Sequence, residues 1–307
     1  GRASTLERDS FYLNQGPHAL YKGGAALEIL SKLNITPQGS VPAPKRSIAV
    51  FKGELLDLPV NATSIVATKL LSMGEKLEWG ILMGNLANTD LSELNSVSLS
   101  SWLKSTVKSE RVQDLFAAMA RLSTYCNNPE KVSAAAAIKQ LVLVQTKGVL
   151  YLDHGWQSLV DSMVQSIRET QTKAERPQFT EIYGAEVTAI SSTKSEHASE
   201  QEPRQHLDKV EITFNGAKQN FDAVILALPP KQVSRLLADG SEETQSLSAT
   251  LENILPSHAA CLDVCLRKLT NADNTFAIGI DEPLYYSVHS TTAKLAQNNH
   301  AVIHLAV

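Results

Sequence analysis

The sequence has little of what metal sites, disulfide frameworks or familiar hydrolases require. It contains 3 cysteines in 307 residues, Cys126, Cys261 and Cys265, and none of them forms a CxxC pair. The 8 histidines are scattered along the chain, so we predict no metal site. The serine nucleophile motif GxSxG, the zinc motif HExxH and the phosphate-binding P-loop are missing, and no catalytic residue can be assigned from motifs of this kind.

Neither charge nor hydropathy indicates a nucleic-acid or membrane partner. Lysine and arginine total 28 and aspartate and glutamate 32, a formal net charge of −4 at pH 7, which gives no general reason to bind nucleic acid. No stretch approaches the roughly 20 apolar residues that cross a bilayer, so we predict no transmembrane segment. With few cysteines and no signal-peptide pattern at its start, the protein is predicted to be cytoplasmic, with membrane association as the alternative.

Helical and strand patterns alternate along the chain, which indicates a mixed α/β (α+β) fold. Apolar residues recur at helical spacing from about residue 62 to 145. Ser47–Lys52 and Glu54–Leu58 flank a turn glycine and are predicted to form a hairpin. Lys209–Phe214 alternates polar and apolar residues, as a strand with one wet face does. Phe221–Leu228 is nearly all apolar and is predicted to be a strand covered on both faces.

Four short segments are more informative together than any of them is alone. They are Gly1-Arg2-Ala3-Ser4-Thr5, Asn14–Tyr21 with its Gly16-Pro17-His18 sequence, Tyr151–Leu159, and Asp222–Pro230. In order and spacing they resemble the GGRxxT, GPH, YPxGGxxxL and strand-PP segments of phytoene-dehydrogenase-like and amine-oxidase-like flavoproteins, across nearly the whole chain. The third segment departs from the family pattern, because Asp153-His154 replaces the usual residues and only Gly155 of a double glycine remains.

The resemblance implies an incomplete FAD-binding, Rossmann-like domain with an inserted substrate domain of helices and a β-sheet. The cofactor domain is expected at residues 1–55 and 148–235, and the substrate domain at 56–147 and 236–307. In the family, a GxGxxG unit precedes GGRxxT and receives the pyrophosphate at a helix N-terminus. That unit, and a later segment that closes over the flavin, are expected to lie outside this chain, which alone is expected to bind FAD poorly and to be inactive.

The resemblance also implies which residues would hold FAD. These are Gly1, Arg2, Gly16, Pro17, His18, Val187, Ala227 and Pro229. Arg2 would offer its guanidinium group to the pyrophosphate, the Gly16–His18 segment would lie beside the isoalloxazine, and the backbone of Val187 would contact the adenine. Five of them have a purely structural alternative: a frayed terminal charge for Arg2, a turn histidine for His18, a core valine for Val187, and a strand end for Ala227 and Pro229.

The family resemblance leads to a first hypothesis about function. An FAD-dependent oxidoreductase would remove hydride from an apolar or amine-bearing small molecule, and the Gly-Pro-His sequence and Asp281–Ser287 are closer to phytoene-dehydrogenase-like proteins than to monoamine oxidases. The alternatives are a flavin-binding or chaperone module of the same fold without turnover, and a flavin monoamine oxidase. The expected partner is the small-molecule substrate; the oligomeric state and the catalytic residues stay open.

Overall fold

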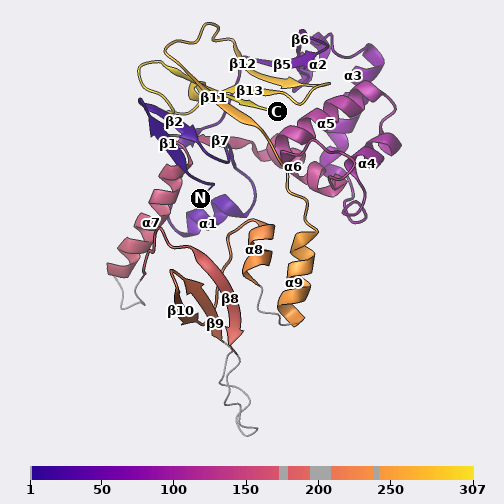
Figure 1. Ribbon diagram of the computed structural model, residues 1–307. Coiled ribbons are helices and arrows are strands. Elements are labelled where there is room, and N and C mark those ends of the chain that lie inside the picture. Colours follow the sequence, from indigo (N-terminus) through magenta and orange to yellow (C-terminus); the bar gives the residue numbers. More distant parts are fainter. Residues whose placement is uncertain (1, 173–178, 194–208, 238–241) are drawn as a thin grey trace. The chain divides into compact units, whose positions relative to one another are not determined.

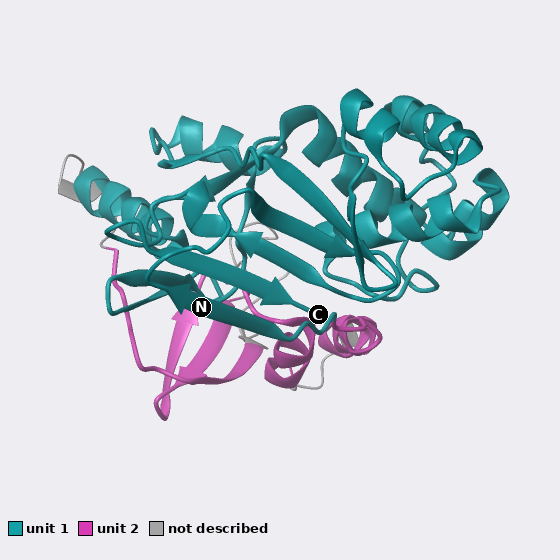
Figure 2. Cartoon of the chain, turned by 90° about the horizontal axis from the view of Figure 1, so that it is seen from above, with its two compact units in different colours: residues 1–177, 257–307 teal, residues 178–256 magenta. Residues whose placement is uncertain are grey.

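The computed structural model describes residues 2–172, 179–193, 209–237 and 242–307. They belong to two compact units (Figure 2): unit 1 comprises residues 1–177 and 257–307, and unit 2 comprises residues 178–256. This division follows compactness, whereas the cofactor and substrate domains predicted above are defined by function. The predicted division into 1–55 with 148–235 and 56–147 with 236–307 therefore stays a prediction.

Unit 1 combines strands from both ends of the chain with helices from its middle (Figure 1). Its strands are β1 (Thr5–Arg8), β2 (Phe11–Asn14), β3 (Leu20–Tyr21), β4 (Gly39–Ser40), β5 (Arg46–Phe51), β6 (Glu54–Asp57), β7 (Val149–Leu152), β11 (Cys261–Leu266), β12 (Asn274–Gly279), β13 (Tyr285–Val288) and β14 (Ala301–Ala306). Its helices are α1 (Ala25–Lys32), α2 (Ala62–Ala67), α3 (Met73–Asn85), η1 (Leu86–Asn88), α4 (Leu99–Thr106), α5 (Glu110–Thr124), α6 (Ala134–Lys147), α7 (Trp156–Thr172) and η2 (His289–Thr291). The predicted helical region 62–145 is thus confirmed, as is the hairpin now called β5 and β6.

A six-stranded sheet in the order β11-β14-β13-β12-β5-β6 connects the two ends of the chain. β5 and β12 run parallel, and the other neighbouring strands are antiparallel. The register places Asp263 opposite His304 and His304 opposite Ser287. Since paired residues of neighbouring strands point to the same face, this row of polar side chains crosses one face of the sheet.

Helices α3 to α6 supply most of the core of unit 1. Trp79 and Phe116 are 1% and 0% exposed, and Ile278 of the sheet belongs to the same cluster. The indole N–H of Trp79 donates to the carbonyl of Pro59 over 2.9 Å, so its one polar atom is satisfied inside the core. Ser72 is the N-cap residue of α3, and its hydroxyl accepts from the Glu75 amide in a capping box.

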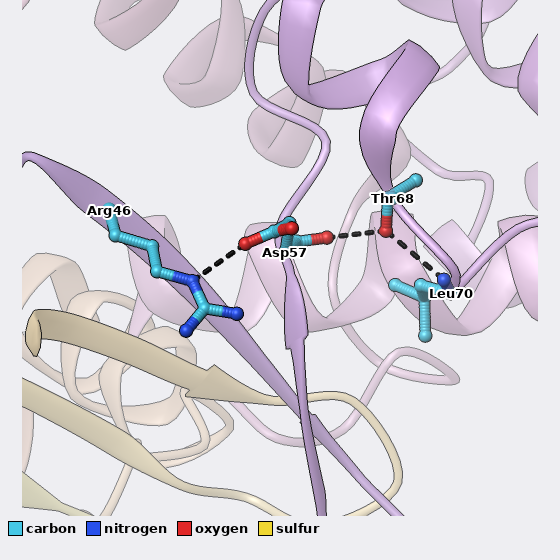
Figure 3. A network of polar contacts seen from close by, with 4 residues as sticks. All are labelled: Arg46, Asp57, Thr68 and Leu70. Carbon is cyan, nitrogen blue, oxygen red and sulfur yellow. Dashed lines mark hydrogen bonds and ion pairs between the residues drawn. The ribbon is translucent and has the colours of Figure 1, made fainter.

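Thr68 ties the β5–β6 hairpin to the helical part of unit 1 (Figure 3). Its buried hydroxyl donates to the carbonyl of Asp57 over 2.5 Å and accepts from the amide of Leu70 over 3.1 Å. On the outer side, Arg46 Nε lies 2.7 Å from Asp57 Oδ1, in an ion pair whose side chains are 44% and 40% exposed. The buried half of this network should therefore contribute more to stability than the exposed half.

This difference can be measured with two variants. Thr68→Val keeps the shape of the side chain but removes the partner of the buried Leu70 amide and of the part-buried Asp57 carbonyl. We expect a loss of about 1–3 kcal/mol in the free energy of unfolding. Arg46→Gln removes a half-exposed ion pair, and we expect a loss of about 0–1 kcal/mol. Urea unfolding of the two variants checks the order; equal losses would contradict it.

Unit 2 is a small antiparallel sheet with two helices. It contains β8 (Val187–Thr193), β9 (Lys209–Phe214), β10 (Ala217–Phe221), α8 (Pro230–Leu236) and α9 (Glu242–Glu252), with the strands in the order β10-β9-β8. Ile190, Val233 and Leu237 form its buried centre. Asn215 and Gly216, both with positive φ, make the two-residue turn between β9 and β10, as type I′ hairpins require.

The prediction of a buried strand at Phe221–Leu228 is wrong in most of its length. Only Phe221 belongs to a strand, β10, and residues 222–228 have no regular secondary structure. Ile225 is 95% exposed and Leu228 43%. An apolar run becomes a covered strand only where other elements lie on both of its sides, and within unit 2 residues 222–228 lack that cover.

Candidate functional site

Three of the four family-like segments meet in unit 1 through a small hydrogen-bond network. The hydroxyl of Thr5 donates to Asn14 Oδ1 over 2.9 Å. The same two oxygens accept the backbone N–H groups of Gln157 and Trp156, over 3.1 and 3.0 Å. These N–H groups begin α7 and would otherwise lack partners, as the first amides of any helix do. The segments around residues 5, 14 and 156 are therefore held together by side chains of the motifs themselves.

Gly16 brings the second segment against the first. A Cβ atom added at Gly16 would stand 2.1 Å from the carbonyl oxygen of Arg2, so no other residue fits without moving the backbone. The amide of Gln15 donates to the carbonyl of Ser4 over 2.9 Å and fixes the same approach. Arg2 itself is exposed, Pro17 is half-buried, and Gly1 lies outside the described residues.

Gly155 allows a similarly close approach of the third segment to the first two. Its φ is +80°, and a Cβ atom would lie 2.3 Å from Thr5 Oγ1 and 2.5 Å from Asn14 Oδ1. His154, at the position of the missing family glycine, keeps a left-handed backbone with φ +59°. Its ring contacts Tyr12 edge-on at 5.1 Å between centroids, and its amide donates to the carbonyl of Lys294. These contacts hold a conformation that glycine adopts more readily.

His18 leads from this network into a buried group of aromatic and polar side chains, which we call the histidine cluster: His18, His289, His304, Tyr151, Tyr285, Ser287 and Asp263. The ring of His18, 7% exposed, lies 3.6 Å from that of His304 and 5.1 Å from that of His289, measured between centroids. Tyr285 Oη lies 2.9 Å from His289 Nε2. His304 Nδ1 lies 2.7 Å from Asp263 Oδ1. Four strands, η2 and the loop after β2 therefore contribute to one site.

Burial keeps most of the cluster uncharged. The pKa of His18 is lowered from 6.5 to about 4, mainly by desolvation and also by the neighbouring His304, while Asp263 acts in the opposite direction. Desolvation, with the neighbouring His18 and His304, also holds the pKa of His289 well below its ordinary value. The pKa values of Tyr151 and Tyr285 are raised, mainly by burial. At neutral pH His18 and His289 are therefore neutral imidazoles, and the two tyrosines are neutral phenols.

One atom of the cluster stands apart. Nε2 of His304 is buried and has no hydrogen-bond partner among the described residues, although the side chain is only 2% exposed. An unpaired buried polar atom costs about 1–3 kcal/mol. Such atoms in native structures call for an explanation, and a bound molecule is one.

The remaining predicted cofactor residues lie in unit 2. Val187 begins β8, an edge strand of its sheet, and is 37% exposed; it is not the core valine that the structural alternative supposed. Ala227 is exposed, and the half-buried Pro229 precedes α8 as its N-cap residue. All of them are surface or half-surface positions within unit 2.

Sequence reasoning found His18 but missed the other members of the cluster. Asp263 and His304 are single polar residues inside the otherwise apolar strands β11 and β14. A lone charged or imidazole group in such a run is a usable signal, because burial of a polar group requires a partner. Their pairing, however, depends on strand register 41 residues apart in sequence. In the described part of the chain, no group of three or more His, Cys, Asp or Glu residues is arranged to hold a metal ion.

Comparison with known proteins gives a family and a fold. The sequence profile of the family "Flavin containing amine oxidoreductase" matches residues 1–256. No curated protein matches significantly. Among solved structures, an oxidoreductase from Methanosarcina mazei has a TM-score of 0.71 at 16% identity, covering 100% of this chain and 70% of that one.

Two further structures widen the comparison. A putrescine oxidase variant from a redesign of cofactor binding has a TM-score of 0.64 at 14% identity, covering 100% of this chain and 67% of that one. Rab GDI from Plasmodium falciparum has a TM-score of 0.57 at 13% identity, covering 98% and 68%. At these identities the likeness concerns the fold, which is the mixed α/β fold that the sequence predicted. None of the helices described here combines the length and apolarity needed to cross a bilayer.

Proposed function

Because the chain belongs to the family of flavin-containing amine oxidoreductases, a family of flavin-dependent enzymes, we propose that its cofactor is FAD and that it removes hydride from an apolar or amine-bearing small molecule. The observation that carries this proposal is the joining of three family-like segments in unit 1, through Thr5, Asn14 and Gly155. Bound FAD would accept the hydride, and the protein would supply orientation, exclusion of water and electrostatics.

The residues of unit 1 suit a flavin in three respects. The exposed guanidinium group of Arg2 is free to reach charged oxygens. Gly16 permits close backbone approach next to it. Beside Gly16, His18 is buried with a pKa near 4, and a neutral imidazole can lie against a flat aromatic ring without a charge to desolvate. Gly1, Pro17, Val187, Ala227 and Pro229 stay predicted contacts.

Bound flavin is directly visible in the absorption spectrum. We expect the natural gene product to be purified with the visible bands of oxidised flavin and to release FAD on denaturation. Arg2→Gln should raise the dissociation constant for FAD by about 10- to 100-fold, because it removes charge-assisted hydrogen bonds. Arg8→Gln is the matched control, since Arg8 is exposed and pairs with Asp9 at 3.7 Å; it should leave the affinity unchanged.

The outcome separates the rival functions. A natural gene product without flavin would reject the proposal. Flavin that is bound tightly but is not reduced anaerobically by any amine or apolar substrate would favour a binding module, a possibility that the shared fold of Rab GDI keeps open. Reduction by amines alone would favour an amine oxidase over a phytoene-dehydrogenase-like activity.

A further inference from the structure

Nε2 of His304 is one of four buried side-chain atoms without a hydrogen-bond partner among the described residues, and it is the one that belongs to the histidine cluster. His304 lies in the middle of β14 and is 2% exposed. Its Nδ1 is 2.7 Å from a carboxylate oxygen of Asp263, on the neighbouring strand β11. The two ring nitrogens are thus in opposite situations, one paired with an acid and the other without a partner among the described residues.

The carboxylate determines which nitrogen carries the proton. An ionised carboxylate can only accept hydrogen bonds, so Nδ1 of His304 must be the donor in this pair. A neutral imidazole has one N–H, and Nε2 therefore presents a lone pair. The Asp263 side chain is 18% exposed, so the acid is in contact with solvent while the imidazole is buried. The pair holds a buried imidazole with its basic nitrogen turned away from the acid.

The groups that face this imidazole do not compete for its role. They are Asp263 on β11, His18 in the loop after β2, His289 in η2 and Tyr285 on β13. The pKa values of His18 and His289 are lowered, and that of Tyr285 is raised, so at pH 7 the first two hold a proton poorly and the third releases one poorly. Efficient proton acceptors have a pKa near the working pH. His304 is the imidazole of the cluster that lies within hydrogen-bond distance of a carboxylate.

We propose that His304 is a catalytic base that takes a proton from a substrate ammonium group, and that Asp263 is its positioning residue. This inference rests on the proposed function and narrows its substrate to an amine. Nε2 takes one proton from R2CH–NH3+ and leaves the neutral amine R2CH–NH2. The neutral amine could then give up a hydride from its carbon while the nitrogen lone pair forms the C=N bond of R2C=NH2+, and bound FAD would be the oxidant that accepts the hydride. His304 returns its proton to solvent.

The test uses the flavin-loaded natural protein, with n-hexylamine and benzylamine as probes. Anaerobic flavin reduction is followed in stopped flow across pH for the wild type, H304Q, D263N and H258Q. Loss of a general base lowers a rate by about 10²- to 10⁴-fold, and we expect this for H304Q at pH 7, a smaller loss for D263N, and none for H258Q, which alters an exposed histidine. Equal flavin content in all four proteins shows that the variants fold.

A structural role and a base role differ in their dependence on pH. If His304 removes the ammonium proton, the deficit of H304Q must shrink as the pH approaches the pKa of the alkylamine, about 10, because the probe then arrives neutral. A deficit that stays constant with pH would overturn the proposal. Side-chain NMR gives a second reading without substrate: wild-type His304 should be the Nδ1–H tautomer, and an Nε2–H tautomer would overturn the proposal.

The result distinguishes this inference from the function on which it rests. A natural protein without flavin would overturn both. Flavin that is bound and is reduced by neither amine would overturn the role of His304 as an ammonium base and leave the flavin proposal standing. Reduction with an unchanged rate in H304Q would do the same.

Discussion

Lowering the pH from 6.5 to 4 should destabilise the protein by about 3 kcal/mol through His18 alone. The pKa of His18 is 6.5 in an unfolded chain and about 4 in the folded protein, and this difference corresponds to about 3 kcal/mol. Between these two values the unfolded chain binds a proton at His18 that the folded protein does not. The free energy of unfolding therefore rises with pH between 4 and 6.5. The stability that neutral His18 contributes is fully present above pH 6.5 and is lost as the pH falls to 4.

The surroundings of His18 explain why its pKa is lowered in the folded protein. His304 lowers the pKa of His18, and Asp263 raises it without cancelling the desolvation. His289 also faces His18, and its own pKa is held low. His289 adds to the effect, because its own pKa is lowered by burial and by the other two imidazoles. Acid should accordingly act on the cluster before most carboxylates are protonated.

Urea unfolding at a series of pH values measures this effect. The matched variant is His18→Asn, which keeps a polar side chain and cannot bind the proton; it should flatten the curve between pH 6.5 and 4 by about 3 kcal/mol relative to wild type. His258→Asn, which alters an exposed histidine, should leave the slope unchanged. A slope of the same size in His18→Asn as in wild type would contradict the assignment to His18.

The parts of the fold that depend on local sequence were predictable. Gly53 and the Asn215-Gly216 pair have positive φ at the turns of the β5–β6 and β9–β10 hairpins. The type of such a turn depends on the identity of its two or three adjacent residues, which can be read from the sequence. The helices between residues 62 and 145 follow from apolar spacing and from hydroxyl caps such as Ser98, the N-cap residue of α4. Helical periodicity and capping act within a few residues.

What depends on distant partners was not predictable. β5 pairs in parallel with β12, more than 220 residues away, and β13 was not foreseen as a strand at all. The histidine cluster arises only when that sheet brings residues 18, 263, 289 and 304 together. The exposed Ile225 is an example of a wrong prediction from local sequence. The apolar run around it suggested burial, but burial depends on whether other elements pack against the run.

Gly155→Ala should destabilise unit 1 by about 2–5 kcal/mol. The left-handed backbone at φ +80° costs a residue with a Cβ atom about 1–2 kcal/mol. The added methyl would also lie 2.3 Å from Thr5 Oγ1 and 2.5 Å from Asn14 Oδ1, and forcing an extra methyl group into a packed site costs about 1–3 kcal/mol more. Either oxygen can move away only by releasing an amide at the start of α7.

Gly53→Ala is the matched control for this substitution. Gly53 has nearly the same φ, +78°, lies in the same unit, and has nothing within 4 Å of the added Cβ atom. The free energy of unfolding of Gly53→Ala should therefore fall only by the cost of the left-handed backbone, about 1–2 kcal/mol. Urea unfolding measures this loss for both variants, and the difference between the two losses is the cost of the clash at Gly155. If the methyl separates the three segments, Gly155→Ala should also weaken FAD binding while Gly53→Ala does not. Equal stability and equal flavin affinity in the two variants would show that the network of Thr5, Asn14 and Gly155 does not hold the segments together.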